Sequence, residues 1–314
     1  MTFDKRTFIQ SPKAYPNKVR LVEMSPRDGL QNETGGFVPT QTKIELINRL
    51  SDTGLIHIEA ASFVSPKWVP QMKDASQVMK GIERKNGVTY SVLTPNMRGL
   101  EGALAADAQE VSVFSAASES FTQKNINCSI EESLARFIPV IEAAKAQNIP
   151  VRGYVSTVMG CPYEGEIPPE KVAHVAKALY DMGCYEISLG DTIGTGTPLK
   201  AKRMLEAVNK EVPMHLLAAH FHDTYGQAIG NLNAVLEEGL AIIDSSVAGL
   251  GGCPYAKGAS GNVASEDVLY LLDGLGIETG IDLQAMVDTG FWICEQINRT
   301  NGSKVALAKG ISQA

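Results

Sequence analysis

The chain has 314 residues, of which 44% are hydrophobic and 20% charged, and it carries a formal net charge of −7. This composition is that of a globular protein and excludes disordered, collagen-like and coiled-coil chains. No run of Lys and Arg supplies the positive charge that binding to nucleic acid or to an anionic membrane requires. No segment has the apolar character of a secretory signal or the length of a membrane span, so we expect a cytoplasmic protein.

Cysteine usage separates structural from reactive roles. Five cysteines, at positions 128, 161, 184, 253 and 294, are scattered without CxxC spacing. An odd number at such spacing argues against a disulfide framework and against a structural zinc site. Any functional cysteine of this chain is therefore expected to act as a free thiol.

Short runs rich in β-branched residues alternate with longer amphipathic segments from end to end. The strands are predicted at Val19 to Glu23, Ile56 to Ala60, Val88 to Leu93, Glu110 to Phe114, Val151 to Val155, Glu186 to Leu189, Leu216 to Phe221 and Ile242 to Val247. Eight strand-helix units without a linker predict an α/β fold, the (β/α)8 TIM barrel. A doubly wound sheet would need a Gly-rich phosphate turn after the first strand, and MSPRDG stands there instead.

The helical segments carry start signals and define the domain. Ser129 and Glu132 are spaced as a capping box, and another helix begins at Pro169. A last helix, Leu283 to Arg299, follows the eighth unit as an additional C-terminal helical segment. We expect one catalytic domain over residues 1–314, with the barrel at about 19–277 and the extension at about 282–314.

Polar residues at the carboxyl ends of the strands are the first candidates for chemistry, because this end of such barrels holds the active site. Strand seven ends in His220 and His222, and residues at i and i+2 of a strand face the same side. Paired imidazoles there predict half of a divalent-metal site. Asp28, after strand one, is the natural carboxylate donor, and Asn262 offers a neutral oxygen. Together they describe an open site for Mg²⁺ or Mn²⁺.

A glycine-rich loop follows strand eight and contains Cys253, in GGCPY at 251–255. The glycines predict a mobile loop in which a thiol can approach a bound ligand. Cys161 lies in a similar sequence, GCPY at 160–163, and local sequence does not choose between the two cysteines. Only the nearby Asn262 favours Cys253.

Six longer motifs run along the chain. They are SPRDGLQNE at 25–33, SFVSPKWVPQM at 62–72, RGYVST at 152–157, GCYEISLGDTIGTGTP at 183–198, HFHDTYGQA at 220–228 and SVAGLGGCPY at 246–255. Together they resemble the motifs of 3-hydroxy-3-methylglutaryl-CoA lyase, in a bacterial member, and SVAGLGGCPY matches the signature of that family over all its residues. The resemblance implies a metal-dependent TIM barrel that cleaves (S)-3-hydroxy-3-methylglutaryl-CoA to acetyl-CoA and acetoacetate, in leucine degradation and ketone-body formation.

The resemblance also implies roles for individual residues. The implied metal ligands are Asp28, His220, His222 and Asn262. Arg27 would stabilise the thioester enolate, an oxyanion-hole function, and Cys253 would be the catalytic thiol. By itself, the neighbouring pair of Arg27 and Asp28 would be interpreted as a surface ion pair.

Further positions match supporting parts of the family's active site. Glu59, at the end of strand two, and Asp191, which follows strand six, match catalytic positions. Tyr154 and Thr192 would bind substrate together with Arg27. The acceptor of the C3 hydroxyl proton is left open between His220 and Asp28, with Asp191 as a relay.

Two other classes of function compete with the lyase. A Claisen-type condensing enzyme or 2-oxo-acid aldolase on the same metal barrel would share the Arg-Asp-Gly turn and the paired histidines, but would not need the Gly-Gly-Cys-Pro-Tyr loop. A non-catalytic binding barrel would need none of this set. We expect an acyl-CoA substrate and a homo-oligomer, with a dimer favoured, and no nucleic-acid or membrane partner.

Overall fold

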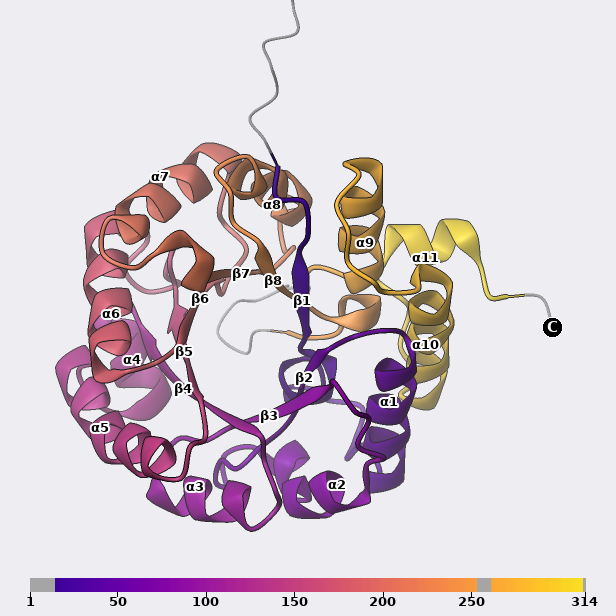
Figure 1. The fold of residues 1–314 in the computed structure, drawn as a ribbon, viewed down its shortest axis with the longest axis horizontal. Helices are drawn as coiled ribbons and strands as arrows, with labels where there is room; N and C mark the ends of the chain where they lie inside the picture. The colour runs from indigo at the N-terminus through magenta and orange to yellow at the C-terminus, as the bar shows by residue number, and fades with distance from the viewer. Residues whose placement is uncertain (1–14, 253–260, 313–314) are drawn as a thin grey trace, which may run out of the picture.

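The protein, seen in a computed structural model that describes residues 15–252 and 261–312, is built around a ring of strands. Eight parallel strands form a closed barrel in the order β1 to β8, with helices around it (Figure 1). The strands are β1 (Arg20–Glu23), β2 (His57–Ser62), β3 (Thr89–Leu93), β4 (Glu110–Ala116), β5 (Val151–Ser156), β6 (Glu186–Asp191), β7 (Leu217–Phe221) and β8 (Ile242–Ser245). The predicted TIM barrel and its eight strands are confirmed, with strand ends shifted by one or two residues.

Helices follow the strands and cover the outside of the ring. They are α1 (Thr40–Asp52), α2 (Ala75–Gly81), α3 (Met97–Leu104), α4 (Glu119–Ile126), α5 (Ile130–Ala146), α6 (Pro169–Met182), α7 (Pro198–Asn209), α8 (Ala228–Leu236), α9 (Ser265–Gly274), α10 (Leu283–Gln296) and α11 (Lys304–Lys309). The predicted capping box of Ser129 and Glu132 starts α5. Within the described parts of the chain, no helix is long and apolar enough to cross a membrane.

The barrel interior is unusually polar. Successive strand residues point alternately outward to the helices and inward to the barrel, and the interiors of such barrels are commonly filled by branched apolar side chains. Here the inward positions carry interacting polar groups, namely Arg20, His57, Glu59, Glu110, Ser112, Arg152, Tyr154, Glu186, Ser188, His220 and Asp244. Because most of these groups are buried, each charge requires a partner within the barrel.

The C-terminal extension differs from its prediction at one end. Helix α10 ends at Gln296 rather than at Arg299, because Asn298 adopts a left-handed φ of 52° that turns the chain out of the helix. The helix packs against α1 and α9 (Figure 1). The Arg49 guanidinium of α1 lies 4.6 Å from the ring centroid of Trp292. Arg299 therefore lies in the connection that leads to α11.

Candidate active site

Arg27 and Asp28 lie directly after β1, in one π-helical turn over Ser25–Gly29. Such turns are rare and occur frequently at functional sites. Gly29 is required in this turn, since a Cβ there would lie 2.9 Å from Ser246 Oγ. The turn is thus packed against the residues that follow β8.

The two histidines and Asp28 form a cluster. The rings of His220 and His222 have centroids 5.5 Å apart. The Nε2 atom of each histidine lies 3.9 Å from Asp28 Oδ2. One ligand atom from each of the three residues lies within 4.8 Å of the others, so the group could hold a metal ion. The structure therefore brings together the carboxylate and the two imidazoles among the four predicted ligands.

Asn262, the fourth, is attached to the same carboxylate. Its Nδ2 donates to Asp28 Oδ2 at 2.7 Å and to the Leu250 carbonyl at 3.2 Å. Its Oδ1 is buried and has no hydrogen-bond partner among the described residues. An unsatisfied buried acceptor costs about 1–3 kcal/mol, and a cation would remove that cost. One carboxylate, two imidazoles and one amide oxygen fit a divalent ion that prefers oxygen and nitrogen ligands.

The electrostatic environment keeps these donors ready to bind a cation. Burial acts to raise the pKa of Asp28, but Arg27 and the two histidines outweigh it and lower the pKa to about 2. Burial is the main cause that lowers the pKa of His222 to about 4, and His220 acts in the same direction. At neutral pH the carboxylate is ionised and His222 is neutral, and these are the protonation states that bind metal.

A second set of contacts fixes the Arg27 guanidinium. Its Nε donates to Glu59, and its Nη1 donates to Asp28 Oδ1 at 2.7 Å. Glu59 Oε1 in turn accepts from Ser112 Oγ at 2.6 Å and from the Tyr154 hydroxyl at 3.2 Å. Burial acts to lower the pKa of Arg27, but Glu59 and Asp28 outweigh it and raise the pKa above its ordinary value. The result is a fixed positive charge beside the three clustered donors.

Below His220, a buried ion pair sets the orientation of its ring. His220 Nδ1 lies 3.1 Å from Asp244 Oδ2. Asp244 also accepts from Arg152 Nη1 and Nη2 at 2.9 and 2.6 Å, and from Ser188 Oγ at 2.7 Å. Burial acts to raise the pKa of Asp244, but Arg152 lowers it well below its usual range. The ionised carboxylate therefore accepts Nδ1–H and leaves Nε2 free to face Asp28.

The pair of Arg152 and Asp244 was not predicted from the sequence. Its one visible signal is that a charged residue stands inside each of the apolar runs VRGYV and IIDSSV. A charge inside a strand of a buried sheet needs a partner, but the sequence does not show that the two strands face each other across the barrel.

Asp191 ends β6 and orders the loop that follows, while Thr192, the next residue, contacts the segment after β5. Asp191 accepts backbone hydrogen bonds from Thr195 at 3.2 Å and from Gly196 at 2.8 Å. Burial raises the pKa of Asp191 to about 6, although these backbone groups act against it. Thr192 Oγ1 accepts from the Thr157 backbone at 2.8 Å. The relay and substrate-binding roles of the two residues stay predictions.

The two candidate cysteines differ in what the structure describes. Cys161 is 3% exposed and belongs to the hydrophobic core, with its Sγ 3.0 Å from Ser118 Oγ at the start of α4. Cys253 lies outside the described residues, and its role as the catalytic thiol stays a prediction.

The residues between β8 and Cys253 are anchored by two buried carboxyl groups. Glu23 Oε1 accepts from Val247 N at 2.9 Å, and its Oε2 accepts from Ser265 Oγ at 2.6 Å. Glu266 accepts from Ala248 N at 3.0 Å through both oxygens. Ala248 has a left-handed φ of 57°. The carboxyl groups thus hold a backbone turn that L-residues rarely adopt.

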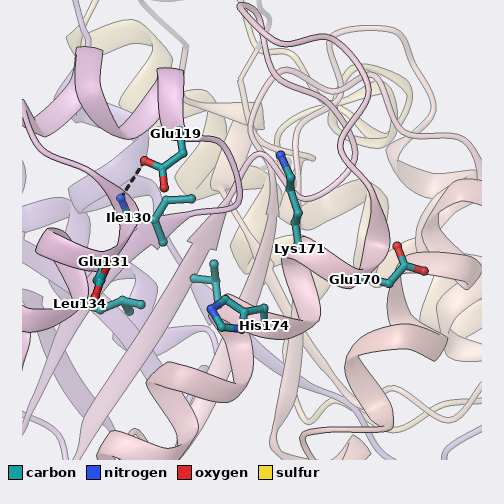
Figure 2. Close-up of a pocket in the computed structure, with 8 residues that line it drawn as sticks. Glu119, Ile130, Glu131, Leu134, Glu170, Lys171 and His174 are labelled. Carbon is teal, nitrogen blue, oxygen red and sulfur yellow. Dashed lines mark hydrogen bonds between the residues drawn. The ribbon is translucent and has the colours of Figure 1, made fainter.

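A separate hollow of about 590 Å³ lies on the surface between α4, α5 and α6 (Figure 2). It is lined by Glu119, Ile130, Glu131, Leu134, Glu170, Lys171, His174 and Val175. Its carboxylates are exposed to solvent, and that of Glu119 accepts from Ile130 N at 3.0 Å. None of the candidate catalytic residues lines it, so this hollow is distinct from the cluster around Asp28.

We expect Asp244→Asn to weaken Mn²⁺ binding by about 10–100-fold, the range seen when a group that orients a ligand is lost. The new amide group would face donors from Arg152, Ser188 and His220, so the His220 ring would lose its orientation. Mn²⁺ binding is measured by electron paramagnetic resonance. Glu110→Gln, another buried interior change whose carboxylate contacts His57 instead, is the matched control. Equal affinities in Asp244→Asn and wild type would contradict the role of Asp244.

We expect Glu266 to make stability fall as pH rises. Burial, supported by Glu23, raises the pKa of Glu266 from 4.5 to about 8. Between these values the folded state binds the extra proton, so the free energy of unfolding decreases with increasing pH. Glu266→Gln cannot ionise and retains an acceptor for Ala248 N.

Melting temperatures at pH 5, 7 and 9 test this expectation. The difference between wild type and Glu266→Gln should shift in favour of the variant at high pH, while the exposed Glu131→Gln should follow wild type. Parallel curves for wild type and Glu266→Gln would show that the carboxyl group ionises normally.

Known proteins match this chain over almost its whole length. The model of the HMGL-like family matches residues 18–293. Hydroxymethylglutaryl-CoA lyase, mitochondrial, from Gallus gallus is 63% identical over 295 residues, which are 94% of this chain and 99% of that protein. The cytoplasmic 3-hydroxy-3-methylglutaryl-CoA lyase from Homo sapiens is 61% identical over 293 residues, which are 93% of this chain and 79% of that protein.

Solved structures give the same picture. Hydroxymethylglutaryl-CoA lyase from Pseudomonas aeruginosa has 59% identity and a TM-score of 0.92, covering 94% of this chain and 99% of its own. An HMG-CoA lyase from Acinetobacter baumannii, in complex with coenzyme A and 3-methylmalate, has 36% identity and a TM-score of 0.89, covering 94% and 96%. A putative aldolase from Bacteroides vulgatus, at 18% identity and a TM-score of 0.63, shares the fold alone. The chain therefore belongs to the hydroxymethylglutaryl-CoA lyase family.

Proposed function

We propose that this chain cleaves (S)-3-hydroxy-3-methylglutaryl-CoA to acetyl-CoA and acetoacetate, with a divalent cation held by Asp28, His220, His222 and Asn262. As a family member, the chain is a carbon–carbon lyase. The observation that supports the site is that three metal donors lie within 4.8 Å of one another beside the buried Arg27 guanidinium. An aldolase is disfavoured, because the putative aldolase from Bacteroides vulgatus is only 18% identical and shares the fold alone.

The reaction changes the charge at two positions of the substrate, the C3 hydroxyl and the thioester oxygen. The C3 hydroxyl loses its proton, the bond between C2 and C3 breaks, and negative charge develops on the thioester oxygen of the departing acetyl-CoA. When bound, the cation lowers the pKa of a chelated hydroxyl and neutralises the substrate carboxylate. The chain must then supply the second positive charge and the proton transfers.

Arg27 supplies the charge at the thioester. Glu59 and Asp28 engage its Nε and Nη1, so the guanidinium is fixed before substrate arrives. A preorganised charge at the position of the developing oxyanion stabilises the transition state without a reorganisation cost. Tyr154 hydrogen-bonds Glu59, and the guanidinium carbon of Arg27 lies 5.6 Å from the Tyr154 ring centroid, which supports a role for Tyr154 in shaping this subsite.

Two proton transfers complete the reaction. His220 and Asp28 are the candidate acceptors of the C3 hydroxyl proton, and both stand in the cluster. Cys253 is the candidate proton donor to the enolate carbon, because a thiol can protonate that carbon after the bond between C2 and C3 has broken. Asp191 is proposed as the relay for the hydroxyl proton, and Thr192 is proposed to bind substrate.

The remaining predictions from the sequence extend this proposal. We propose Mg²⁺ or Mn²⁺ as the ion, one catalytic domain over residues 1–314, a homodimer and a cytoplasmic location. Relatives named mitochondrial and cytoplasmic both match the chain. An acyl-CoA substrate is supported by the coenzyme A in the Acinetobacter baumannii relative.

The proposed activity is tested by release of acetoacetate from 3-hydroxy-3-methylglutaryl-CoA. We expect turnover with Mg²⁺ or Mn²⁺, its loss after chelation with EDTA, and its return when the ion is added back, because the cation is proposed to neutralise the substrate carboxylate and to lower the pKa of the C3 hydroxyl. No release with any divalent ion would refute the lyase. Condensation of acetyl-CoA with a 2-oxo acid would instead identify the competing class.

We expect Arg27→Lys to lower kcat by about 10²–10³-fold, as loss of an oxyanion donor does. A single ammonium group cannot contact Glu59, Asp28 and the thioester oxygen in the geometry of the guanidinium fork. Steady-state kinetics with saturating metal measures the change. The control is Arg49→Lys, on the outer face of α1, which should leave kcat unchanged, and near-normal turnover of Arg27→Lys would defeat the enolate-stabilising role.

A further inference from the structure

The backbone just before Cys253 is held by two side chains that come from distant parts of the chain. Arg299 Nη2 donates to the Gly251 carbonyl at 3.1 Å. Asn32 Nδ2 donates to the Gly252 carbonyl at 3.0 Å. Gly251 and Gly252 have no side chains of their own, so side chains from elsewhere in the chain fix the position of this segment through its carbonyl oxygens.

The Arg299 guanidinium connects the residue after α10 to two distant segments, one at Gly251 and one at Glu33. Its Nη1 forms an ion pair with Glu33, at the end of the SPRDGLQNE motif that also contains Arg27 and Asp28. The Glu33 side chain is 12% exposed and that of Arg299 is 30% exposed, so the pair is partly shielded from water. The left-handed turn at Asn298 is what directs Arg299 out of the α10 helix.

The held segment lies directly against a candidate metal ligand. A Cβ on Gly251 would come within 2.8 Å of Asn262 Nδ2, and a Cβ on Gly261 would come within 2.5 Å of the Gly251 carbonyl carbon. With no room between these backbones, a shift of Gly251 must be transmitted to Asn262. Asn262 is the residue whose buried Oδ1 has no hydrogen-bond partner within residues 15–252 and 261–312.

We propose that Arg299 is a positioning residue of the active site, which acts by fixing Gly251 against Asn262. The C-terminal extension thereby contributes to the site without contacting substrate. This inference rests on the proposed function, because it assigns Asn262 to the bound cation. Asn32 and Glu33 assist, the first by holding the next carbonyl and the second by orienting the guanidinium.

Arg299 is not needed to attach the extension to the barrel. Met286 and Ile293 of α10 are fully buried, and Arg49 covers the Trp292 ring from α1. These contacts stabilise the helix independently of residues 251–252. The matched control is therefore Arg49→Ala on α1, which weakens the packing of α10 but leaves the hydrogen bond from Arg299 to Gly251 in place.

The experiment compares Arg299→Lys, Arg299→Ala and Arg49→Ala in the full chain. Arg299 uses two separate nitrogens for Glu33 and the Gly251 carbonyl, whereas a lysine has a single nitrogen, so we expect it to keep the ion pair and to lose the second contact. We expect both Arg299 variants to raise the Kd for Mn²⁺ by about tenfold and to lower kcat by about tenfold or more, with KM little changed. Arg49→Ala should lower the melting temperature while kcat and the Mn²⁺ affinity stay at wild-type values.

Three results would overturn the inference. They are wild-type kcat and Mn²⁺ affinity in Arg299→Lys, equal losses in Arg49→Ala, and a loss of kcat in Arg299→Lys that only follows a loss of folded protein by circular dichroism. Glu33→Gln is a second variant that leaves Arg299 in place, and it should weaken Mn²⁺ binding in the same direction but less. Failure of the proposed function gives a different result from failure of this inference. In that case the wild-type protein would be inactive in the lyase assay, while the Kd for Mn²⁺ could still be compared between wild type and the variants.

Discussion

The site depends on one buried ion pair inside the barrel, between Arg152 and Asp244. Without Arg152, the carboxylate of Asp244 would be an uncompensated charge in a dry interior and would take up a proton. A neutral carboxyl group would no longer fix the Nδ1–H of His220, and the ring could rotate away from Asp28. The orientation of a residue at the mouth of the barrel is therefore decided by a charge pair one layer deeper.

The polar interior costs free energy of folding, and apolar packing in the outer layer of the barrel offsets this cost. Paired charges in a low-dielectric interior contribute little to stability, because desolvation consumes most of their attraction. The free energy of folding must come from the apolar contacts between the strands and the surrounding helices. The barrel thus separates the two tasks, with stability in its outer shell and chemistry along its axis.

Much of this arrangement follows from local sequence patterns, and the rest depends on pairings across the fold. Alternation of β-branched and amphipathic segments predicts the eight strands, and residue parity predicts that His220 and His222 share a face. The partnership of Arg152 with Asp244 joins residues 92 positions apart, which no local pattern reveals. Arg299 was expected at the end of a helix, because apolar spacing does not predict that Asn298 would turn left-handed. The inward orientation of His57 likewise depends on partners from other strands, namely Arg20, Ser91 and Glu110.

The candidate site is assembled from the two ends of the chain. The bond between Asn262 and Asp28 joins residues 234 positions apart, and the ion pair between Arg299 and Glu33 spans 266 positions. During synthesis on the ribosome, Asp28 is made long before its partner Asn262, and Glu33 is made long before its partner Arg299. Loop closure over such distances is entropically expensive and slow. The proposed metal site can therefore form only after Asn262 has been made, because a nascent chain that ends before this residue lacks the fourth donor.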